Sequence, residues 1–227
     1  MIDQNSLLSI IDHTLLKAEA SREQIIQLCQ EAISYGAATV FTHGYYTPLV
    51  AEQLAGSSVK VGATAGFPYG AQPAAVKAFE ARTSIADGAQ EIDIVLNIGA
   101  MKSGDFDAVY RDICGVREAC ADRAILKVIL ETCLLTREEK IRACEICVKA
   151  GADFVKTSTG LSYGGATVED IRLMRSVVGD RAKVKAAGGI RTLQQALDMV
   201  AAGADRIGTS SMLAIAAEIA ASKHADQ

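Results

Sequence analysis

The chain has 227 residues, of which half are hydrophobic and 22% are charged, so it can bury a substantial core. Its formal net charge is −4 and its Lys and Arg residues are scattered, which argues against a nucleic acid partner. No run of about 18 apolar residues is present, so we expect no membrane-spanning helix.

From its beginning, MIDQNSLLSIIDHTLL, the chain lacks the basic start and apolar block of a signal peptide, and we expect a cytoplasmic protein. Eight short apolar segments then alternate with helical patterns. The predicted strands are 11–15, 38–43, 60–66, 91–97, 125–131, 153–159, 183–187 and 206–209. The predicted helices are 22–35, 73–86, 106–120, 137–150, 168–178, 193–202 and one near 212–222.

Eight strand–helix units without a linker predict a parallel α/β fold in one domain over residues 1–227. That number favours a closed (β/α)8 TIM barrel, with a short N-terminal helix, over an open doubly wound sheet. No G-x-G-x-x-G follows the first strand, which weighs against a dinucleotide fold. Gly-Ala pairs precede four of the strands, at Gly36, Gly88, Gly151 and Gly203, and we expect these glycines to end helices with positive φ.

The six cysteines and three histidines give no reason to expect a metal. Cys144 and Cys147 form a lone C-x-x-C inside a helical pattern, whereas a zinc site needs a second pair of ligands. Without an export signal, the cysteines are expected to be reduced. We therefore predict no metal site.

Three lysines at equal intervals are the main chemical signal. Lys127, Lys156 and Lys185 lie 29 residues apart, each in an apolar strand where an unpaired ammonium group is unfavourable. Equal spacing predicts that the three lysines lie at similar depth in the barrel, on neighbouring strands. Lys127, however, is farther from the next turn of the chain than Lys156 and Lys185 are, which predicts that it lies deeper. Crowded ammonium groups lower one another's pKa, which makes a lysine nucleophilic near neutral pH. The alternative is that each lysine simply pairs with a carboxylate.

Period-two alternation points the three lysines and Asp93 into one barrel lumen. Catalytic residues of such barrels collect at the carboxyl ends of the strands, where Lys156 and Lys185 lie two or three residues from glycine-containing turns. Asp93 would move protons. Residues alone do not choose between Lys156 and Lys185 as the nucleophile.

Two loops have the character of a phosphate site. They are 188–191 after the seventh strand and 208–211 after the eighth, where glycines permit close approach to backbone N–H groups. The alternative is a plain helix cap by Ser210 or Ser211. A phosphorylated substrate, an amine nucleophile and a carboxylate together indicate a class I aldolase. Another lysine-Schiff-base aldolase or transaldolase-like transferase, and a non-catalytic sugar-phosphate-binding barrel, stay open.

Seven stretches of the chain resemble the 2-deoxy-D-ribose-5-phosphate aldolase family, in the family's order and over nearly the whole length. They are IDHTLLK (11–17), EIDIVLNIGAMKSGD (91–105), LKVILETCLLT (126–136), AGADFVKTSTG (150–160), GGATVEDIRLMR (164–175), VKAAGGIRT (184–192) and GADRIGTSS (203–211).

The resemblance implies a barrel that reversibly cleaves 2-deoxy-D-ribose 5-phosphate to glyceraldehyde 3-phosphate and acetaldehyde without a cofactor, often as a homodimer. It implies that Lys156 forms the Schiff base, that Lys185 lowers the pKa of Lys156 and relays protons, and that Asp93 is the catalytic carboxylate. Supporting polar positions match Lys127, Asp12 and Thr14. Phosphate-binding positions match Gly160, Gly188, Gly189, Gly208, Ser210 and Ser211.

Some positions depart from the family pattern. Phe41 stands for a cysteine and His43 for an asparagine, and both are expected near the mouth of the barrel, where they would affect acceptor preference and tolerance of crotonaldehyde. Ala187 stands where serine or proline is more usual, and Met212 where glycine is common.

Overall fold

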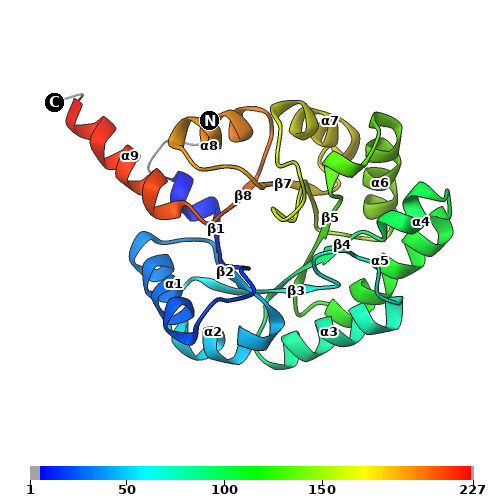
Figure 1. The fold of residues 1–227 in the computed structure, drawn as a ribbon, viewed down its shortest axis with the longest axis horizontal. Coiled ribbons are helices and arrows are strands. Elements are labelled where there is room, and N and C mark those ends of the chain that lie inside the picture. Colours follow the sequence, from blue (N-terminus) through cyan, green and yellow to red (C-terminus); the bar gives the residue numbers. More distant parts are fainter. Residues whose placement is uncertain (1–5, 226–227) are drawn as a thin grey trace.

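Eight parallel strands close into a barrel with helices around it in the computed structural model, which describes residues 6–225 (Figure 1). Each strand pairs with the next along the chain, and the last pairs with the first, which confirms the predicted (β/α)8 barrel. The strands are β1 (Ile11–Thr14), β2 (Thr39–Thr42), β3 (Lys60–Ala65), β4 (Glu91–Val95), β5 (Ile125–Ile129), β6 (Phe154–Lys156), β7 (Lys183–Ala187) and β8 (Arg206–Thr209).

The helices connect the strands on the outside of the barrel. They are α1 (Arg22–Tyr35), α2 (Thr47–Gln53), α3 (Ala74–Ala86), α4 (Ile98–Lys102), α5 (Phe106–Cys120), α6 (Arg137–Lys149), α7 (Val168–Val178), α8 (Leu193–Ala201) and α9 (Met212–Ala225). The short N-terminal helix is a 3-10 turn, η1 (Leu7–Ile10), and similar turns lie at η2 (Gly44–Tyr46) and η3 (Thr132–Leu134). The sequence did not predict α2 and α4, because helices of seven and five residues are too short for a helical period to be read.

The helix ends follow from local chemistry. Ser21 caps α1 in a reciprocal pair with Gln24, whose side chain accepts from the Ser21 N–H. The four glycines of the Gly-Ala pairs have φ of 67°, 106°, 77° and 113°, a region that residues with a Cβ rarely adopt. The prediction that these glycines end helices with positive φ is confirmed.

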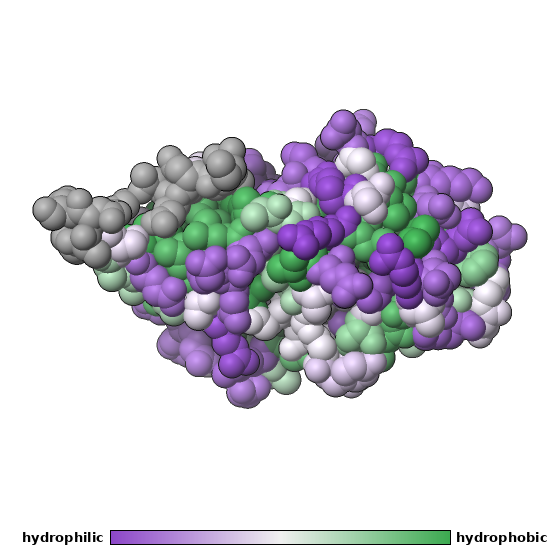
Figure 2. All heavy atoms as spheres, turned by 90° about the horizontal axis from the view of Figure 1, so that it is seen from above, coloured by the Kyte–Doolittle hydropathy of each residue, from purple (hydrophilic) through white to green (hydrophobic). Residues whose placement is uncertain are grey.

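Alternation along the strands separates an apolar layer from a polar lumen. Ile92 and Ile94 are fully buried in the layer beneath the helices, whereas Asp93 belongs to the lumen. On the outer side seen in Figure 2, polar residues predominate and apolar residues surface in separate patches. Within residues 6–225, no helix is long and apolar enough to cross a membrane.

The strand register sets the depth of each lysine. Lys156 lies opposite Lys185, so these two share a level. Lys127 lies opposite Asp93 on one side and Phe154 on the other, two residues below Lys156. Equal spacing along the chain therefore did not give Lys127 equal depth, because β5 and β6 are staggered in the tilted barrel. The prediction from turn distance, that Lys127 lies deeper, is the correct one.

Candidate active site

The carboxylate of Asp93 is the centre of the lumen. Its Oδ2 accepts hydrogen bonds from Lys156 Nζ at 2.7 Å and from Lys185 Nζ at 2.8 Å, and its Oδ1 accepts from Lys127 Nζ at 3.1 Å. Asp93 is fully buried, and none of the three lysines is more than 3% exposed. The lysines are thus paired with a carboxylate, as the alternative interpretation of the sequence predicted, but all three share the carboxylate of Asp93. Strands β4, β5, β6 and β7 each contribute one of these side chains.

A second layer of charges lies beneath Asp93. Lys127 Nζ also donates to Glu91 Oε2 at 2.5 Å. Asp12 forms an ion pair with Lys185 at 2.5 Å, and its other oxygen accepts from Arg206 at 2.6 Å. Arg206 in turn reaches Glu91 at 3.2 Å and closes the network across the barrel. Neither Glu91 nor Arg206 was predicted from the sequence as a site residue. The available signal was that each begins a strand, and its period places it in the lumen.

The network holds four cations and three carboxylates, so it carries one positive charge in excess. Lys127 contacts three carboxylates within 4 Å and Lys185 contacts two, whereas Lys156 contacts only Asp93. Lys156 is therefore the lysine of the three whose positive charge is compensated least.

The pKa values follow these contacts. Burial lowers the pKa of Lys156 to about 8, and the positive charges of Lys185 and Lys127 act in the same direction, against the opposing effect of Asp93. Burial also disfavours charge on Lys127, but Asp93, Asp12 and Glu91 together raise the pKa of Lys127 above its ordinary value. Burial alone would raise the pKa of Asp93, yet the three ammonium groups hold it far below its usual range. At pH 7 about one Lys156 in ten is a neutral amine, against roughly one in 2,500 for an ordinary lysine.

Phe41 does not lie at the mouth of the barrel, contrary to the prediction. Its ring is buried in the lumen, with Lys185 Nζ at 4.0 Å and Lys127 Nζ at 4.3 Å from the ring centroid. A Cβ on Gly62 of the adjacent strand would lie 2.5 Å from this ring, so the ring of Phe41 fits only because Gly62 has no side chain. His43 is nearer the predicted place: it lies in the loop after β2, and its Nε2 is 3.1 Å from the Leu16 carbonyl oxygen.

A cavity of about 260 Å³ opens above Lys156 at the carboxyl ends of the strands. The predicted phosphate residues Gly160, Gly188, Gly189, Gly208 and Ser210 line it, together with Thr14 and Ala187. Ser211 is not among the lining residues, and its backbone N–H is donated to the Thr209 hydroxyl at 2.9 Å. Met212 is fully buried as the first residue of α9.

The cavity lining is positively charged. Lys17, Lys156 and Arg191 line it, and no lining residue is a carboxylic acid. Gly188 and Gly189 have φ of 93° and 79°, which turns the loop after β7 in a way that side chains disfavour. A Cβ on Gly165 would lie 2.3 Å from the Gly188 carbonyl oxygen, so this loop also packs tightly against its neighbour. The sequence analysis did not identify Lys17 and Arg191 individually, although both lie within the quoted motifs.

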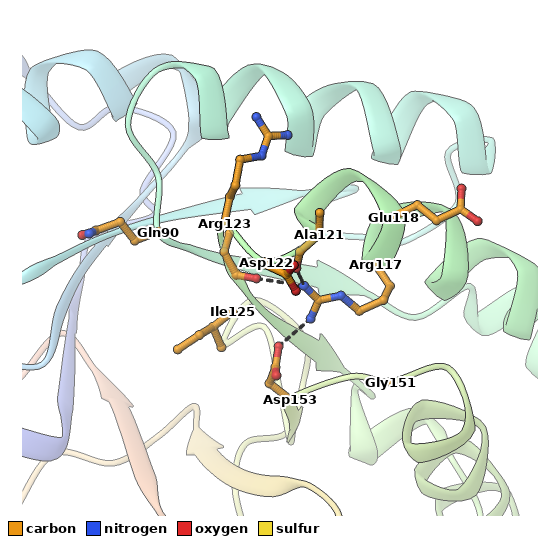
Figure 3. Close-up of a pocket in the computed structure, with 10 residues that line it drawn as sticks. Gln90, Arg117, Glu118, Ala121, Asp122, Arg123, Ile125, Gly151 and Asp153 are labelled. Atoms are coloured by element: carbon orange, nitrogen blue, oxygen red, sulfur yellow. Dashed lines mark hydrogen bonds and ion pairs between the residues drawn. The ribbon is translucent and has the colours of Figure 1, made fainter.

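The opposite end of the barrel has a wider hollow of about 610 Å³, bordered by Gln90, Arg117 and Asp153 (Figure 3). There Arg117 Nη1 donates to Asp153 Oδ2 at 2.7 Å, and the guanidinium also bonds to backbone carbonyls. None of the lysines of the lumen reaches this hollow. Among residues 6–225, no cluster of three or more His, Cys, Asp or Glu side chains could hold a metal ion.

Comparison with known proteins gives a consistent family. The family model described as DeoC/LacD family aldolase matches residues 6–218. The chain is 58% identical over 204 residues to the deoxyribose-phosphate aldolase of Thermococcus gammatolerans, which covers 88% of this chain and 91% of that protein. It is 52% identical over 212 residues to the deoxyribose-phosphate aldolase of Geobacillus sp., with 93% and 95% of the two chains covered.

A solved structure agrees with these matches. The tetrameric deoxyribose phosphate aldolase from Aeropyrum pernix superposes with a TM-score of 0.88 at 35% identity, covering 97% of this chain and 92% of that one. The barrel, the lysine-lined lumen and the sequence matches lead to one conclusion: the chain belongs to the DeoC/LacD family of aldolases.

Proposed function

We propose that this chain is a class I aldolase that reversibly cleaves 2-deoxy-D-ribose 5-phosphate into D-glyceraldehyde 3-phosphate and acetaldehyde, with Lys156 as the nucleophile. One observation carries the proposal: Lys156 alone both contacts Asp93 and lines the cavity above the strands. Its depressed pKa and its few carboxylate contacts support the same choice, which the sequence left open between Lys156 and Lys185.

The chemistry follows from these positions. The neutral Lys156 amine adds to the C1 aldehyde of the open-chain sugar, and loss of water gives an iminium ion. A base removes the proton of the C3 hydroxyl, the C2–C3 bond breaks, and its electrons pass into the iminium to give an enamine. Glyceraldehyde 3-phosphate leaves, C2 is protonated, and water releases acetaldehyde from Lys156. Asp93 and Lys185, which are hydrogen-bonded to each other at 2.8 Å, hold and move these protons.

The other end of the substrate is held by the loops after β6, β7 and β8. The phosphate would lie against the backbone of Gly160, Gly188, Gly189, Gly208 and Ser210. Ser211, which precedes α9, lies outside the lining and would act on the phosphate only through the neighbouring backbone. Lys17 and Arg191 supply positive charge at the same wall. Thr14 lines the cavity and donates its hydroxyl to the Asp12 carbonyl at 2.8 Å, whereas Asp12 and Lys127 would support the site from below.

Borohydride trapping with acetaldehyde tests the nucleophile. We expect one ethyl adduct per chain, located on Lys156 by peptide mapping and absent from Lys156→Ala. A Lys183→Ala variant, changed at an exposed lysine of β7, should retain the adduct. An adduct on Lys185 or Lys127 would overturn the assignment of roles, and no adduct on a folded protein would favour a non-catalytic sugar-phosphate-binding barrel.

A panel of donor carbonyl compounds tests the substrate. Condensation of acetaldehyde with glyceraldehyde 3-phosphate supports the proposed reaction, whereas turnover only with other donors would assign the chain to a different Schiff-base aldolase. Because the A. pernix relative is tetrameric, we also propose that this chain forms a homo-oligomer, with a dimer as the smallest unit. Light scattering measures its mass in solution.

A further inference from the structure

Glu131, which lies between β5 and η3, combines backbone strain with deep burial. Its φ and ψ are 55° and 63°, the left-handed region that residues with a Cβ disfavour. Within residues 6–225, the only other residue besides glycine with positive φ is Ala121. Glu131 is 2% exposed, and no step proposed above uses it. A strained, buried acid at the carboxyl end of a barrel strand calls for an explanation.

The carboxylate of Glu131 is bonded to one residue of the neighbouring loop. Its Oε2 accepts the Thr159 hydroxyl at 2.5 Å and the Thr159 backbone N–H at 3.3 Å. The Thr159 hydroxyl oxygen in turn accepts the Leu161 N–H at 3.1 Å. The Glu131 side chain therefore holds Thr159 directly and Leu161 through the Thr159 hydroxyl, on either side of Gly160.

These three residues form one wall of the cavity above Lys156. Gly160 packs against Gly188, which also lines the cavity: a Cβ on Gly188 would lie 3.6 Å from the Gly160 Cα. The phosphate-facing backbone of one loop is thus placed against the other by the bonds from Glu131. The left-handed backbone at Glu131 accompanies this contact between the segment after β5 and the loop after β6.

We propose that Glu131 is a positioning residue, a clamp that holds the loop 159–161 in the conformation that receives the substrate phosphate. The proposal rests on the proposed function, because it names the part of that substrate that the clamp serves. The charge environment agrees with this role. Burial raises the pKa of Glu131, while the Thr159 bonds and the positive charge of Lys156 act in the opposite direction.

The backbone strain supplies a discriminating variant. Glu131→Gly keeps the left-handed turn without strain and removes only the carboxylate arm. Ala121→Gly is its matched control: it relieves positive φ at the far end of the barrel, beside Arg117 (Figure 3), and should leave activity unchanged. A loss in the first variant but not in the second shows that relief of positive φ does not lower activity through a general effect on the barrel.

The experiment compares kcat/KM for 2-deoxyribose 5-phosphate with kcat/KM for 2-deoxyribose, which lacks the phosphate. We expect Glu131→Gly to lose about tenfold or more with the phosphorylated sugar and much less with the other. Thr159→Val should show the same selective loss, and the double variant should lose little more than either single one, because both changes remove one interaction. Equal losses with the two sugars, or additive losses in the double variant, would overturn the proposal.

Binding of inorganic phosphate, measured by calorimetry, separates this proposal from the proposed function. If the wild type and Ala121→Gly cleave neither sugar, the proposed function fails, and the clamp is then judged by phosphate affinity alone. Weaker phosphate binding by Glu131→Gly supports the clamp in that case, and unchanged phosphate binding contradicts it.

Discussion

Replacing Lys185 with methionine should move the pH dependence of the reaction, because Lys185 supplies part of the positive field at Lys156. Both Nζ atoms donate to the same oxygen of Asp93, at 2.7 and 2.8 Å, so they lie no more than about 5.5 Å apart. With an effective dielectric constant of about 20, two charges at this distance repel by about 3 kcal/mol. That energy corresponds to roughly two pH units in the pKa of Lys156.

In the wild type, kcat/KM should rise with pH and level off above about 8, because the neutral amine of Lys156 attacks and its protonated form does not. In Lys185→Met we expect this rising limb of the pH profile of kcat/KM to move to about pH 10, because the Lys156 amine is then more easily protonated. At pH 7 the neutral fraction falls from about one in ten to about one in a thousand, so kcat/KM should fall by about a hundredfold.

The position of the limb, rather than its height, carries the test, because Lys185 also has a proposed part in proton transfer. Lys183→Met is the control: it removes an exposed lysine two residues earlier on the same strand and should leave the limb near 8. A Lys185→Met enzyme that is slow at every pH, with its limb still near 8, would refute the electrostatic argument.

Three further changes test other parts of the site. Asp93→Asn should abolish steady-state cleavage and lower the free energy of unfolding, measured in urea, by about 3–5 kcal/mol. Borohydride trapping on Lys156 should be retained, because loss of the carboxylate disfavours the ammonium form of Lys156. Gly188→Ala should raise KM for the phosphorylated sugar more than Gly189→Ala. Both residues have positive φ, but the added Cβ at Gly188 would lie only 3.1 Å from the backbone of a neighbouring loop, whereas the Cβ at Gly189 would meet open space. Equal effects on KM would contradict this contact. Phe41→Leu removes the ring beneath two ammonium groups and should lower the free energy of unfolding by about 2 kcal/mol, read from thermal denaturation, and an unchanged midpoint would show that the ring adds nothing there.

Alternation and spacing predicted the features that repeat along the chain. The eight strands, the glycines that end helices, and the meeting of Asp93 with the three lysines all follow from a period of two in strands and from the helix-ending role of glycine. These features depend on neighbours in the sequence or on the closure of the barrel, so one sequence is enough to predict them.

Features that depend on register were predicted least well, and the greater depth of Lys127 was indicated only by its distance from the next turn. The stagger between β5 and β6, which sets Lys127 two residues below Lys156, is invisible in equal spacing along the chain. The place of Phe41 depends on Gly62 being beside it in the next strand, which requires the pairing of β2 with β3. Glu131 was not identified as a site residue, because a left-handed backbone at a glutamate has no sequence signal.

The excess charge of the lumen links the stability of the barrel to its chemistry. Four cations face three carboxylates in a buried space, and burying an uncompensated charge is unfavourable. Loss of one proton balances the network, and Lys156, with a single carboxylate contact, is the group from which that loss is easiest. The barrel therefore raises the share of Lys156 in the neutral form that can attack an aldehyde, although the ammonium form still predominates at pH 7. When the iminium ion forms, positive charge returns beside Asp93, which is still ionised because its pKa is held so low. The same carboxylate that keeps the lysines together thus stabilises the charge that the reaction creates.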